Sequence, residues 1–312
     1  MKKNIDNKQM DIDYFLKGIR NMKISEILSS NQPTLSFEVF PPKTDDVYEN
    51  VEKATNAIAD LKPDFMSVTY GAGGGTSKYT TQIATNIKNK GVPALAHLTC
   101  VNANKQSLDI QLEKLKEQGI ENILALRGDL PQGVESTDDW VYKHASELIP
   151  IIKEHGDFCV GGACYPEVHP EALNSSEDIK HLKMKVDAGC EFLTTQMFFD
   201  NSVFFNFLYK VRSAGIMVPV VAGIMPVTNV KQMERIHKLS QAYLPYRFVS
   251  LLDKFSDNPA AMKQAGIAYA TDQIIDLIAS GINNIHIYTM NKPDIAAKIQ
   301  DNLSEIIGSC KH

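Results

Sequence analysis

The sequence predicts a single (β/α)8 barrel, and three observations lead to that prediction. Short apolar segments rich in β-branched and aromatic residues alternate with longer segments whose apolar residues recur every three or four positions. The alternation repeats eight times, without a change of composition that would mark a linker. Alternating strands and helices require a parallel sheet with helical crossovers. A length of 312 residues suits a barrel, a fold of typically about 250 residues, although an open doubly wound sheet would show the same alternation.

The strands are expected where the apolar segments are short and bounded by turn residues. The first, around residues 35–40, is closed by Pro41 and Pro42, and the second runs into the glycine cluster 71–75. The eight expected strands are residues 35–40, 65–70, 93–100, 122–126, 158–164, 192–199, 218–225 and 285–289.

Helices are expected wherever the apolar period lengthens, as at Val51, Ala54 and Ile58. A short helix over residues 22–28 leads into the barrel domain of residues 23–312, and the polar residues 1–22 before it are expected to form a tail. The expected barrel helices are residues 47–61, 77–90, 106–118, 139–154, 176–188, 202–214, 230–239, 259–280 and 293–307.

Composition excludes several classes of protein. A formal net charge of -5 without a long block of Lys or Arg argues against a nucleic-acid-binding surface. The five cysteines show no C-x-x-C spacing, which favours reduced thiols over disulfides or a zinc site. No apolar segment reaches signal-peptide or membrane-spanning length. A cytoplasmic protein that does not enter membranes is therefore expected. A homo-oligomer is also expected, although composition does not bear on it.

Glu38 is the first candidate for chemistry, because it is a carboxylate on an apolar strand. With a period of two, Ser36, Glu38 and Phe40 share one face of this strand. A carboxylate in apolar surroundings must be paired, protonated or functional. The structural alternative is a glutamate that pairs with a lysine or caps a neighbouring helix.

The carboxyl ends of the strands favour the functional interpretation, because active sites of (β/α)8 barrels lie at that end. The amino-terminal ends of the strands carry far fewer residues that could take part in catalysis. The polar residues at the carboxyl ends are Glu38, Thr69, Tyr70, His97, Thr99, Arg127, Asp129, Tyr165, His169, Gln196, His286, Tyr288 and Lys292.

Each of these residues also has a structural interpretation. Arg127 and Asp129 could pair with each other, although a cation beside Gly128 also suits a phosphate or pyrophosphate. Glu167 and His169 suggest a metal pair, but no H-E-x-x-H motif accompanies them, and no metal is expected. Neither a dinucleotide-binding G-x-G-x-x-G nor a P-loop motif is present. No serine or cysteine has the surroundings of a nucleophile.

Taken together, the strand-end motifs resemble the methylenetetrahydrofolate reductases, in their short bacterial form. The match extends in order from about residue 35 to 292, and the sum of the motifs is far more specific than any one of them. The motifs are SFEVFPPK (36–43), SVTYG (67–71), HLTC (97–100), LRGDLP (126–131), YPEVHPEA (165–172), KVDAG (185–189) and HIYT (286–289).

The resemblance implies a barrel that holds FAD at its carboxyl-terminal mouth. NADH or NADPH would reduce the flavin and leave, and 5,10-methylenetetrahydrofolate would then take the hydride to give 5-methyltetrahydrofolate. Opening the folate ring requires protonation of its nitrogen 10, and Glu38 is the implied acid. Apolar neighbours raise the pKa of a buried glutamate, which suits such a proton donor.

The resemblance also assigns binding residues. Arg127 and Lys185 suit the pyrophosphate by their charge, and Asp129 is the implied second catalytic residue, beside flavin and pterin. The implied FAD contacts are Thr69, Tyr70, His97, Arg127, Gly128, Asp129, His144, Ala145, Tyr165, His169, Asp178, His181 and Lys185. The implied substrate contacts are Gln196, Gln232 and Lys292.

Four positions depart from the family pattern. His144 stands where tyrosine is common, and His181 and Met184 replace an asparagine and an arginine near the FAD phosphates. Lys292 replaces an arginine, so it keeps the charge but lacks the bidentate fork.

Two other functions fit a barrel with these residues. An aldolase or lyase using Glu38 as base would need a Schiff-base lysine or a metal at a strand end, and the sequence indicates neither. A flavin- and folate-binding subunit of a larger electron-transfer complex would bind FAD but need a partner subunit for activity.

Overall fold

The structure is a computed structural model that describes residues 22–42, 44–70, 77–101, 103–129 and 140–309. Apart from Met22, the expected tail of residues 1–22 lies outside the described residues, as do the glycine cluster 71–75 and Cys310.

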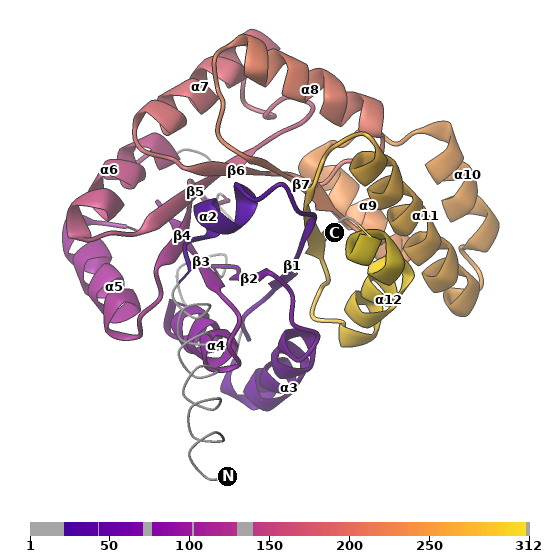
Figure 1. The fold of residues 1–312 in the computed structure, drawn as a ribbon, viewed down its shortest axis with the longest axis horizontal. Helices are drawn as coiled ribbons and strands as arrows, with labels where there is room; N and C mark the ends of the chain where they lie inside the picture. The colour runs from indigo at the N-terminus through magenta and orange to yellow at the C-terminus, as the bar shows by residue number, and fades with distance from the viewer. Residues whose placement is uncertain (1–21, 43, 71–76, 102, 130–139, 310–312) are drawn as a thin grey trace, which may run out of the picture.

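Eight parallel strands form a closed barrel in which each strand pairs with the next and β8 pairs with β1 (Figure 1). This confirms the predicted barrel over the open sheet. The strands are β1 (Thr34–Val39), β2 (Phe65–Val68), β3 (Ala94–Thr99), β4 (Asn122–Leu126), β5 (Cys159–Cys164), β6 (Phe192–Thr195), β7 (Val220–Ile224) and β8 (Asn284–Tyr288).

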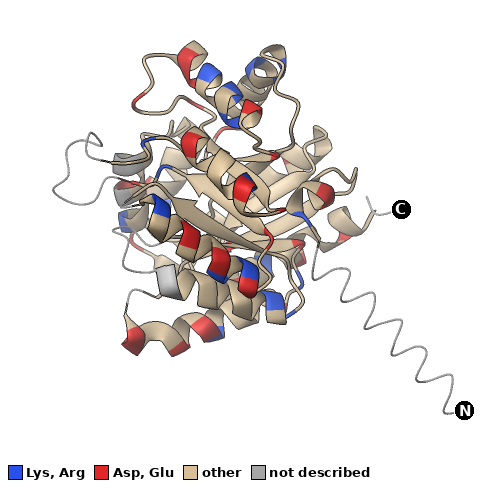
Figure 2. Cartoon of the chain, turned by 90° about the vertical axis from the view of Figure 1, so that its left-hand side faces the viewer, with Lys and Arg blue, Asp and Glu red and all other residues tan. Residues whose placement is uncertain are grey.

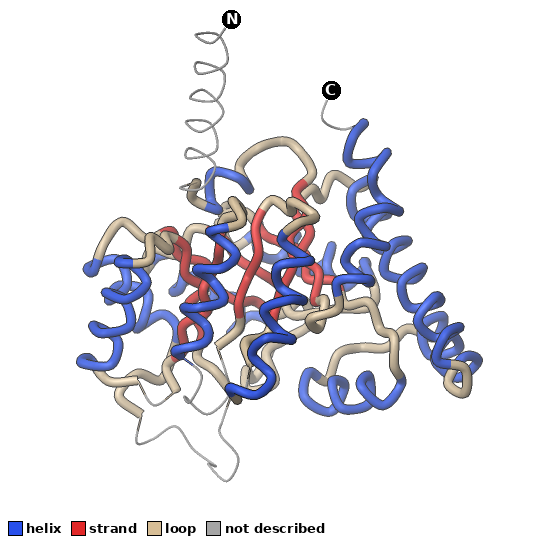
Figure 3. The backbone as a smooth tube through the Cα atoms, turned by 90° about the horizontal axis from the view of Figure 1, so that it is seen from below, coloured by secondary structure: helices blue, strands red, loops and turns tan. Residues whose placement is uncertain are grey.

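Helices surround the strands on the outside, as the tube in Figure 3 shows. The helices are α2 (Ile24–Leu28), α3 (Tyr48–Ala59), α4 (Ser77–Asn89), α5 (Lys105–Glu117), α6 (Ala145–His155), α7 (Ser175–Asp187), α8 (Asn201–Ser213), α9 (Val230–Ser240), α10 (Tyr246–Phe255), α11 (Pro259–Ala279) and α12 (Pro293–Ser309), with a 3-10 turn η1 (Asp45–Val47).

The largest departures from the sequence-based expectations are one missed helix and two boundaries shifted by more than two residues. Helix α10 was not predicted, although Phe248, Leu252 and Phe255 follow the helical period and its apolar face packs in a cluster with Phe199 and Met225. Helix α6 begins at Ala145 rather than 139. Strand β6 ends at Thr195 rather than 199. Phe198 stacks on Phe204 of α8, and Phe199 stacks on Phe248 of α10, so both rings pack against helices and not within the sheet.

The core has an outer and an inner part. The outer part lies between strands and helices, where alternate strand residues such as Phe37 and Val39 are fully buried. The inner part lies within the barrel, where Phe65, Leu124 and Phe192 pack with Ile24 and Leu28 of α2. Helix α2 therefore closes the amino-terminal end of the barrel, so a ligand can enter only at the carboxyl-terminal end.

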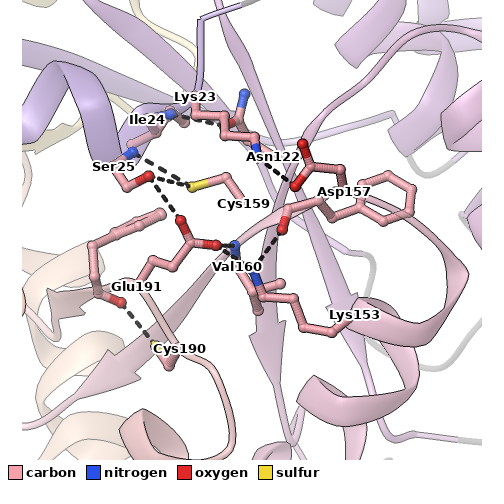
Figure 4. Close-up of polar contacts among 12 residues, drawn as sticks. Lys23, Ile24, Ser25, Asn122, Lys153, Asp157, Cys159, Val160, Cys190 and Glu191 are labelled. Carbon is pink, nitrogen blue, oxygen red and sulfur yellow. Dashed lines mark hydrogen bonds and ion pairs between the residues drawn. The ribbon is translucent and has the colours of Figure 1, made fainter.

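Polar contacts hold α2 in that position (Figure 4). The backbone N–H of Ile24 donates to Asn122 Oδ1 at 2.8 Å, and Ser25 Oγ donates to Glu191 Oε2 at 2.9 Å. The other oxygen of Glu191 pairs with Lys153. These contacts tie the predicted leading helix to β4, α6 and the start of β6.

The charged residues lie mainly on the outer helices and loops, with both signs interspersed (Figure 2). None of the helices in the described ranges is both long and apolar enough to span a membrane.

Candidate active site

Glu38 lies near the carboxyl end of β1 with its side chain inside the barrel and only 7% of the residue exposed. Its Oε2 atom lies 3.4 Å from Ser67 Oγ, 3.6 Å from His97 Nε2 and 3.9 Å from His286 Nε2. Thr289 Oγ1 donates to the Glu38 carbonyl at 2.7 Å and fixes its backbone. The carboxylate thus faces a buried polar cluster rather than a lysine or a helix end among the described residues.

His97 points its Nε2 atom at Glu38 from the neighbouring part of the barrel. Burial lowers the pKa of His97 to about 4, although Glu38 opposes the shift. The imidazole is therefore neutral at pH 7. Among the described residues, Nε2 of His97 and Oγ1 of Thr99 are buried without a hydrogen-bond partner. Both atoms belong to β3, so this strand presents two polar atoms that could bind a ligand at the mouth of the barrel.

His286 is held on the other side of Glu38 by two serines. Its Nδ1 lies 2.8 Å from Ser36 Oγ and its Nε2 lies 3.2 Å from Ser67 Oγ. Strand pairing places these residues side by side, because Ser36 pairs with His286 and Glu38 pairs with Ser67 in the sheet. Ser36 and Ser67 were not among the predicted site residues. The period-two pattern places Ser36 on the face of Glu38, but Ser67 required the register between strands.

Tyr288 connects this cluster to the far side of the mouth. Its hydroxyl donates to the Thr195 carbonyl at 2.5 Å, at the end of β6. Burial, followed by the charge of Glu38, raises the pKa of Tyr288 well above its ordinary value. Tyr288 therefore stays protonated, and its hydrogen bond links β8 to the end of β6.

The segment after β4 places a cation at the mouth. Arg127 pairs with Glu171 rather than with Asp129, which corrects the structural alternative of an Arg127–Asp129 bridge. The pKa of Arg127 is raised, chiefly by its hydrogen bond to Glu171. Gly128 has φ +88°, and a Cβ there would lie 2.5 Å from Val101 Cγ2, so this turn requires glycine. Asp129 is exposed beside them.

The loop after β5 and helix α7 face this cation. The rings of Tyr165 and His169 meet edge to face with centroids 4.7 Å apart. Asp178 Oδ2 accepts from the His169 backbone N–H at 3.1 Å. Lys185 Nζ donates to the Ala163 carbonyl at 2.8 Å, and burial lowers the pKa of Lys185. The structure thus groups Arg127 with four of the predicted FAD contacts.

Other predicted contacts lie at the edge of this group or outside it. Thr69 follows β2, and its N–H donates to Val39 O at 3.1 Å. Tyr70 lines a cavity of about 630 Å³ between α4 and α5, and its hydroxyl donates to Gln111 at 3.1 Å. His144 caps α6 just before the buried Ala145. His181 and Met184 are exposed on α7.

The predicted substrate contacts lie on the β6–β8 side of the mouth. Gln196 follows β6 rather than lying within it; it lies next to Tyr165, and its Oε1 accepts from the Met197 N–H at 3.0 Å. Lys292 Nζ donates to Thr228 Oγ1 at 3.1 Å. Gln232 lies in the first turn of α9, where its N–H donates to Asn229. Tyr288, Thr195, Gln196 and Tyr165 thus connect Glu38 to the group around Arg127.

The remaining candidates have structural contacts. Glu167 Oε1 accepts from the Tyr243 N–H at 2.8 Å, and His169 Nδ1 accepts from the Glu171 N–H at 3.2 Å. Within the described part of the chain, no three His, Cys, Asp or Glu residues are grouped as metal ligands. Burial raises the pKa of the Cys100 thiol to about 12, so it is not a nucleophile near neutral pH.

Comparison with known proteins gives one family. The family model described as methylenetetrahydrofolate reductase matches residues 23–304. The 5,10-methylenetetrahydrofolate reductase of Pectobacterium carotovorum is 36% identical over 280 residues, covering 89% of this chain and 92% of the relative. Methylenetetrahydrofolate reductase (NADH) 1 of Arabidopsis thaliana is 36% identical over 91% of this chain, which spans 50% of that protein.

One solved structure supports the fold. A protein from Clostridium thermocellum, described as binding two copies of 5-methyl-5,6,7,8-tetrahydrofolic acid, superposes with a TM-score of 0.68 over 92% of this chain and 99% of its own. The two sequences are 16% identical, so the similarity is one of fold alone.

Proposed function

Because the chain belongs to the methylenetetrahydrofolate reductase family of oxidoreductases, we propose that it reduces 5,10-methylenetetrahydrofolate to 5-methyltetrahydrofolate with FAD as cofactor. NADH or NADPH gives the hydride in a first half-reaction and leaves before folate enters. The observation that supports this assignment best is the carboxylate of Glu38, buried at the mouth and surrounded by donors.

The residues at the mouth fit FAD. The unpartnered Nε2 of His97 and Oγ1 of Thr99 offer polar atoms to a flavin ring at the end of β3. Arg127 and Lys185 offer cations to the pyrophosphate, and Tyr165 and His169 offer ring surfaces between them. When bound there, FAD supplies the hydride transfer, which no amino-acid side chain can perform.

Glu38 is the proposed general acid. Ring opening of the folate needs a proton on nitrogen 10, and a buried carboxylic acid inside the barrel can hold and deliver it. His97 does not compete for this role, because its pKa of about 4 leaves it neutral and without a proton to give at pH 7. Asp129, exposed beside the mouth, is proposed to steady the cationic folate by its negative charge.

Folate is proposed to enter on the β6–β8 side. Gln196 and Gln232 offer amides to the pterin, and Lys292 offers a charge to it or to the glutamate tail. Thr228 fixes the Lys292 ammonium, which partly replaces the orientation that an arginine fork would supply.

The test is anaerobic stopped-flow spectroscopy on the purified full chain. The protein should be yellow, NADH or NADPH should bleach the flavin, and 5,10-methylenetetrahydrofolate should restore its colour. A colourless protein that takes up no added FAD contradicts the proposal. A flavin that neither nucleotide reduces until a partner protein is added would indicate the electron-transfer subunit instead.

A further inference from the structure

We propose that Ser67 passes a proton from His286 to Glu38 and so supplies the proton that Glu38 gives to the substrate. This inference rests on the proposed role of Glu38. Ser67 and His286 act through Glu38, and they are therefore positioning residues of the reaction.

Ser67 bridges two groups that do not contact each other directly. Glu38 Oε2 and His286 Nε2 are 3.9 Å apart, which is too long for a hydrogen bond. Ser67 Oγ lies 3.4 Å from Glu38 Oε2 and 3.2 Å from His286 Nε2. Ser67 and His286 are 1% and 2% exposed, so bulk water does not reach the hydroxyl. The serine is therefore the short route between acid and imidazole.

Ser36 fixes which ring nitrogen of His286 carries a proton. Its hydroxyl lies 3.0 Å from the Ile285 carbonyl, which can only accept, so Ser36 donates its single proton there. The 2.8 Å contact between Ser36 Oγ and His286 Nδ1 then requires a donating Nδ1–H. In a neutral ring this leaves Nε2 free to accept from Ser67.

Two proton arrangements satisfy every contact in this chain. In the first, protonated Glu38 donates to Ser67 Oγ, and the Ser67 hydroxyl donates to Nε2 of a neutral His286. In the second, imidazolium Nε2–H donates to Ser67 Oγ, and the Ser67 hydroxyl donates to the Glu38 carboxylate. The Ser67 hydroxyl reverses its direction between them, and the pair of Glu38 and His286 holds one transferable proton in both.

The chain protonates Glu38 by two linked transfers that convert the second arrangement into the first. The Ser67 O–H proton moves to Glu38 Oε2, which is then ready to give it to the substrate nitrogen. The proton on His286 Nε2 moves to Ser67 Oγ at the same time. The net result is one proton moved from His286 to Glu38, with the serine unchanged and the imidazole neutral.

The other titratable groups facing this chain do not replace His286. His97 on β3 faces Glu38, but its pKa of about 4 keeps it neutral at pH 7. Tyr288 on β8 directs its proton to the Thr195 carbonyl. The His286 ring is also held in place, with Phe65 stacked parallel to it at 5.8 Å and Tyr288 meeting it edge to face at 5.4 Å.

The kinetic test compares Ser67→Ala with Ser67→Thr, which keeps a hydroxyl, and with the control Thr194→Val. Thr194 is a buried barrel hydroxyl on β6, and among the described residues its Oγ1 has no hydrogen-bond partner. Ser67→Ala should slow folate-driven reoxidation of the flavin about 10- to 100-fold. This loss is at most the smallest effect expected from removing a general acid, about 10²-fold, because Glu38 itself remains. Flavin reduction by the nucleotide should stay within about twofold. Ser67→Thr should recover most of the rate, and Thr194→Val should leave both half-reactions unchanged.

A spectroscopic test does not depend on activity. In [15N]histidine-labelled protein, assigned with His286→Gln, the neutral His286 ring should carry its proton on Nδ1. Ser67→Ala should move the Nε2 resonance by removing its hydrogen bond. An Nε2–H tautomer in the neutral ring overturns the proposal, as does a Ser67→Ala variant with both half-reactions at the wild-type rate. If Glu38→Gln also leaves folate reduction intact, the proposed acid role of Glu38 is at fault, whereas a wild-type protein that reduces no folate puts the proposed function itself at fault.

Discussion

Arg127, after β4, is ion-paired with Glu171 in the loop after β5, so the cation expected to hold the FAD pyrophosphate already has a carboxylate partner. The two side chains are 24% and 57% exposed. A pair this exposed contributes about 0–1 kcal/mol, which a phosphate can displace.

Glu171→Gln should therefore tighten FAD binding by up to about fivefold, because it removes a competitor for Arg127. The measurement is a titration of apoprotein with FAD followed by flavin fluorescence. Asp187→Asn is the matched control, since it removes a surface carboxylate that pairs with Lys183 on the same loop-and-helix unit. Weaker binding in Glu171→Gln would mean that Glu171 orients Arg127 instead of competing for it.

Glu38→Gln should separate the two half-reactions. The amide keeps the shape of the side chain but cannot supply a proton, so folate-driven reoxidation should fall about 10²- to 10⁴-fold. Reduction by NADH or NADPH needs no such proton and should remain within about twofold. Anaerobic stopped-flow traces of each half-reaction provide the measurement, and an equal loss in both would refute the proton-donor role.

Asp129→Asn should raise the midpoint potential of the bound flavin. A negative charge near the flavin disfavours the reduced form, and removing it favours reduction. Because Asp129 is exposed, we expect a modest increase of about 30 mV, equivalent to 1.4 kcal/mol for two electrons. The measurement is a redox titration with a reference dye. An unchanged potential would show that the carboxylate does not act on the flavin.

Gly128→Ala should destabilise the protein by about 1–3 kcal/mol and reduce its FAD content. Alanine is strained at φ +88°, and its Cβ would lie 2.5 Å from Val101 Cγ2. Gly281→Ala is the control, because Gly281 has φ +85° with nothing within 4 Å. Urea unfolding should show the larger loss for Gly128→Ala. Equal losses would indicate that backbone strain alone matters at this turn.

Acid should destabilise the fold through His97. Its pKa is 6.5 in an ordinary environment and about 4 when buried here, so between these values the unfolded chain binds more protons. The stability that neutral His97 provides is therefore present above pH 6.5 and lost as the pH falls toward 4. Between pH 7 and pH 5 the free energy of unfolding should drop by about 2 kcal/mol from this group.

Urea unfolding of the wild type and of His97→Gln at both pH values tests this expectation. The variant lacks the titrating ring, so its loss between pH 7 and pH 5 should be smaller by about the same 2 kcal/mol. A wild-type protein and variant with equal pH dependence would show that His97 is charged or hydrated in the native state.

From the sequence alone followed the eight alternating strands and helices and the strand ends that carry polar residues, whereas closure of the sheet into a barrel did not. Both follow from local rules, because apolar periodicity specifies strands and helices and their alternation specifies a parallel sheet. Glu38 could be singled out because a carboxylate among apolar strand residues is costly unless it is paired or protonated. The missed helix α10 shows the limit, since Phe248 and Leu252 follow the helical period but become buried only against residues of other elements.

Which polar side chains meet depends on the tertiary structure. Ser67 became a neighbour of Glu38 because β1 and β2 pair in that register, and His286 joined them because β8 closes the barrel beside β1. Arg127 pairs with Glu171 because the loop after β5 lies beside it in space, although Asp129 is only two positions away in the sequence. Contacts such as that between Glu38 and Thr289, which are 251 positions apart, depend on closure and register, which no local pattern encodes.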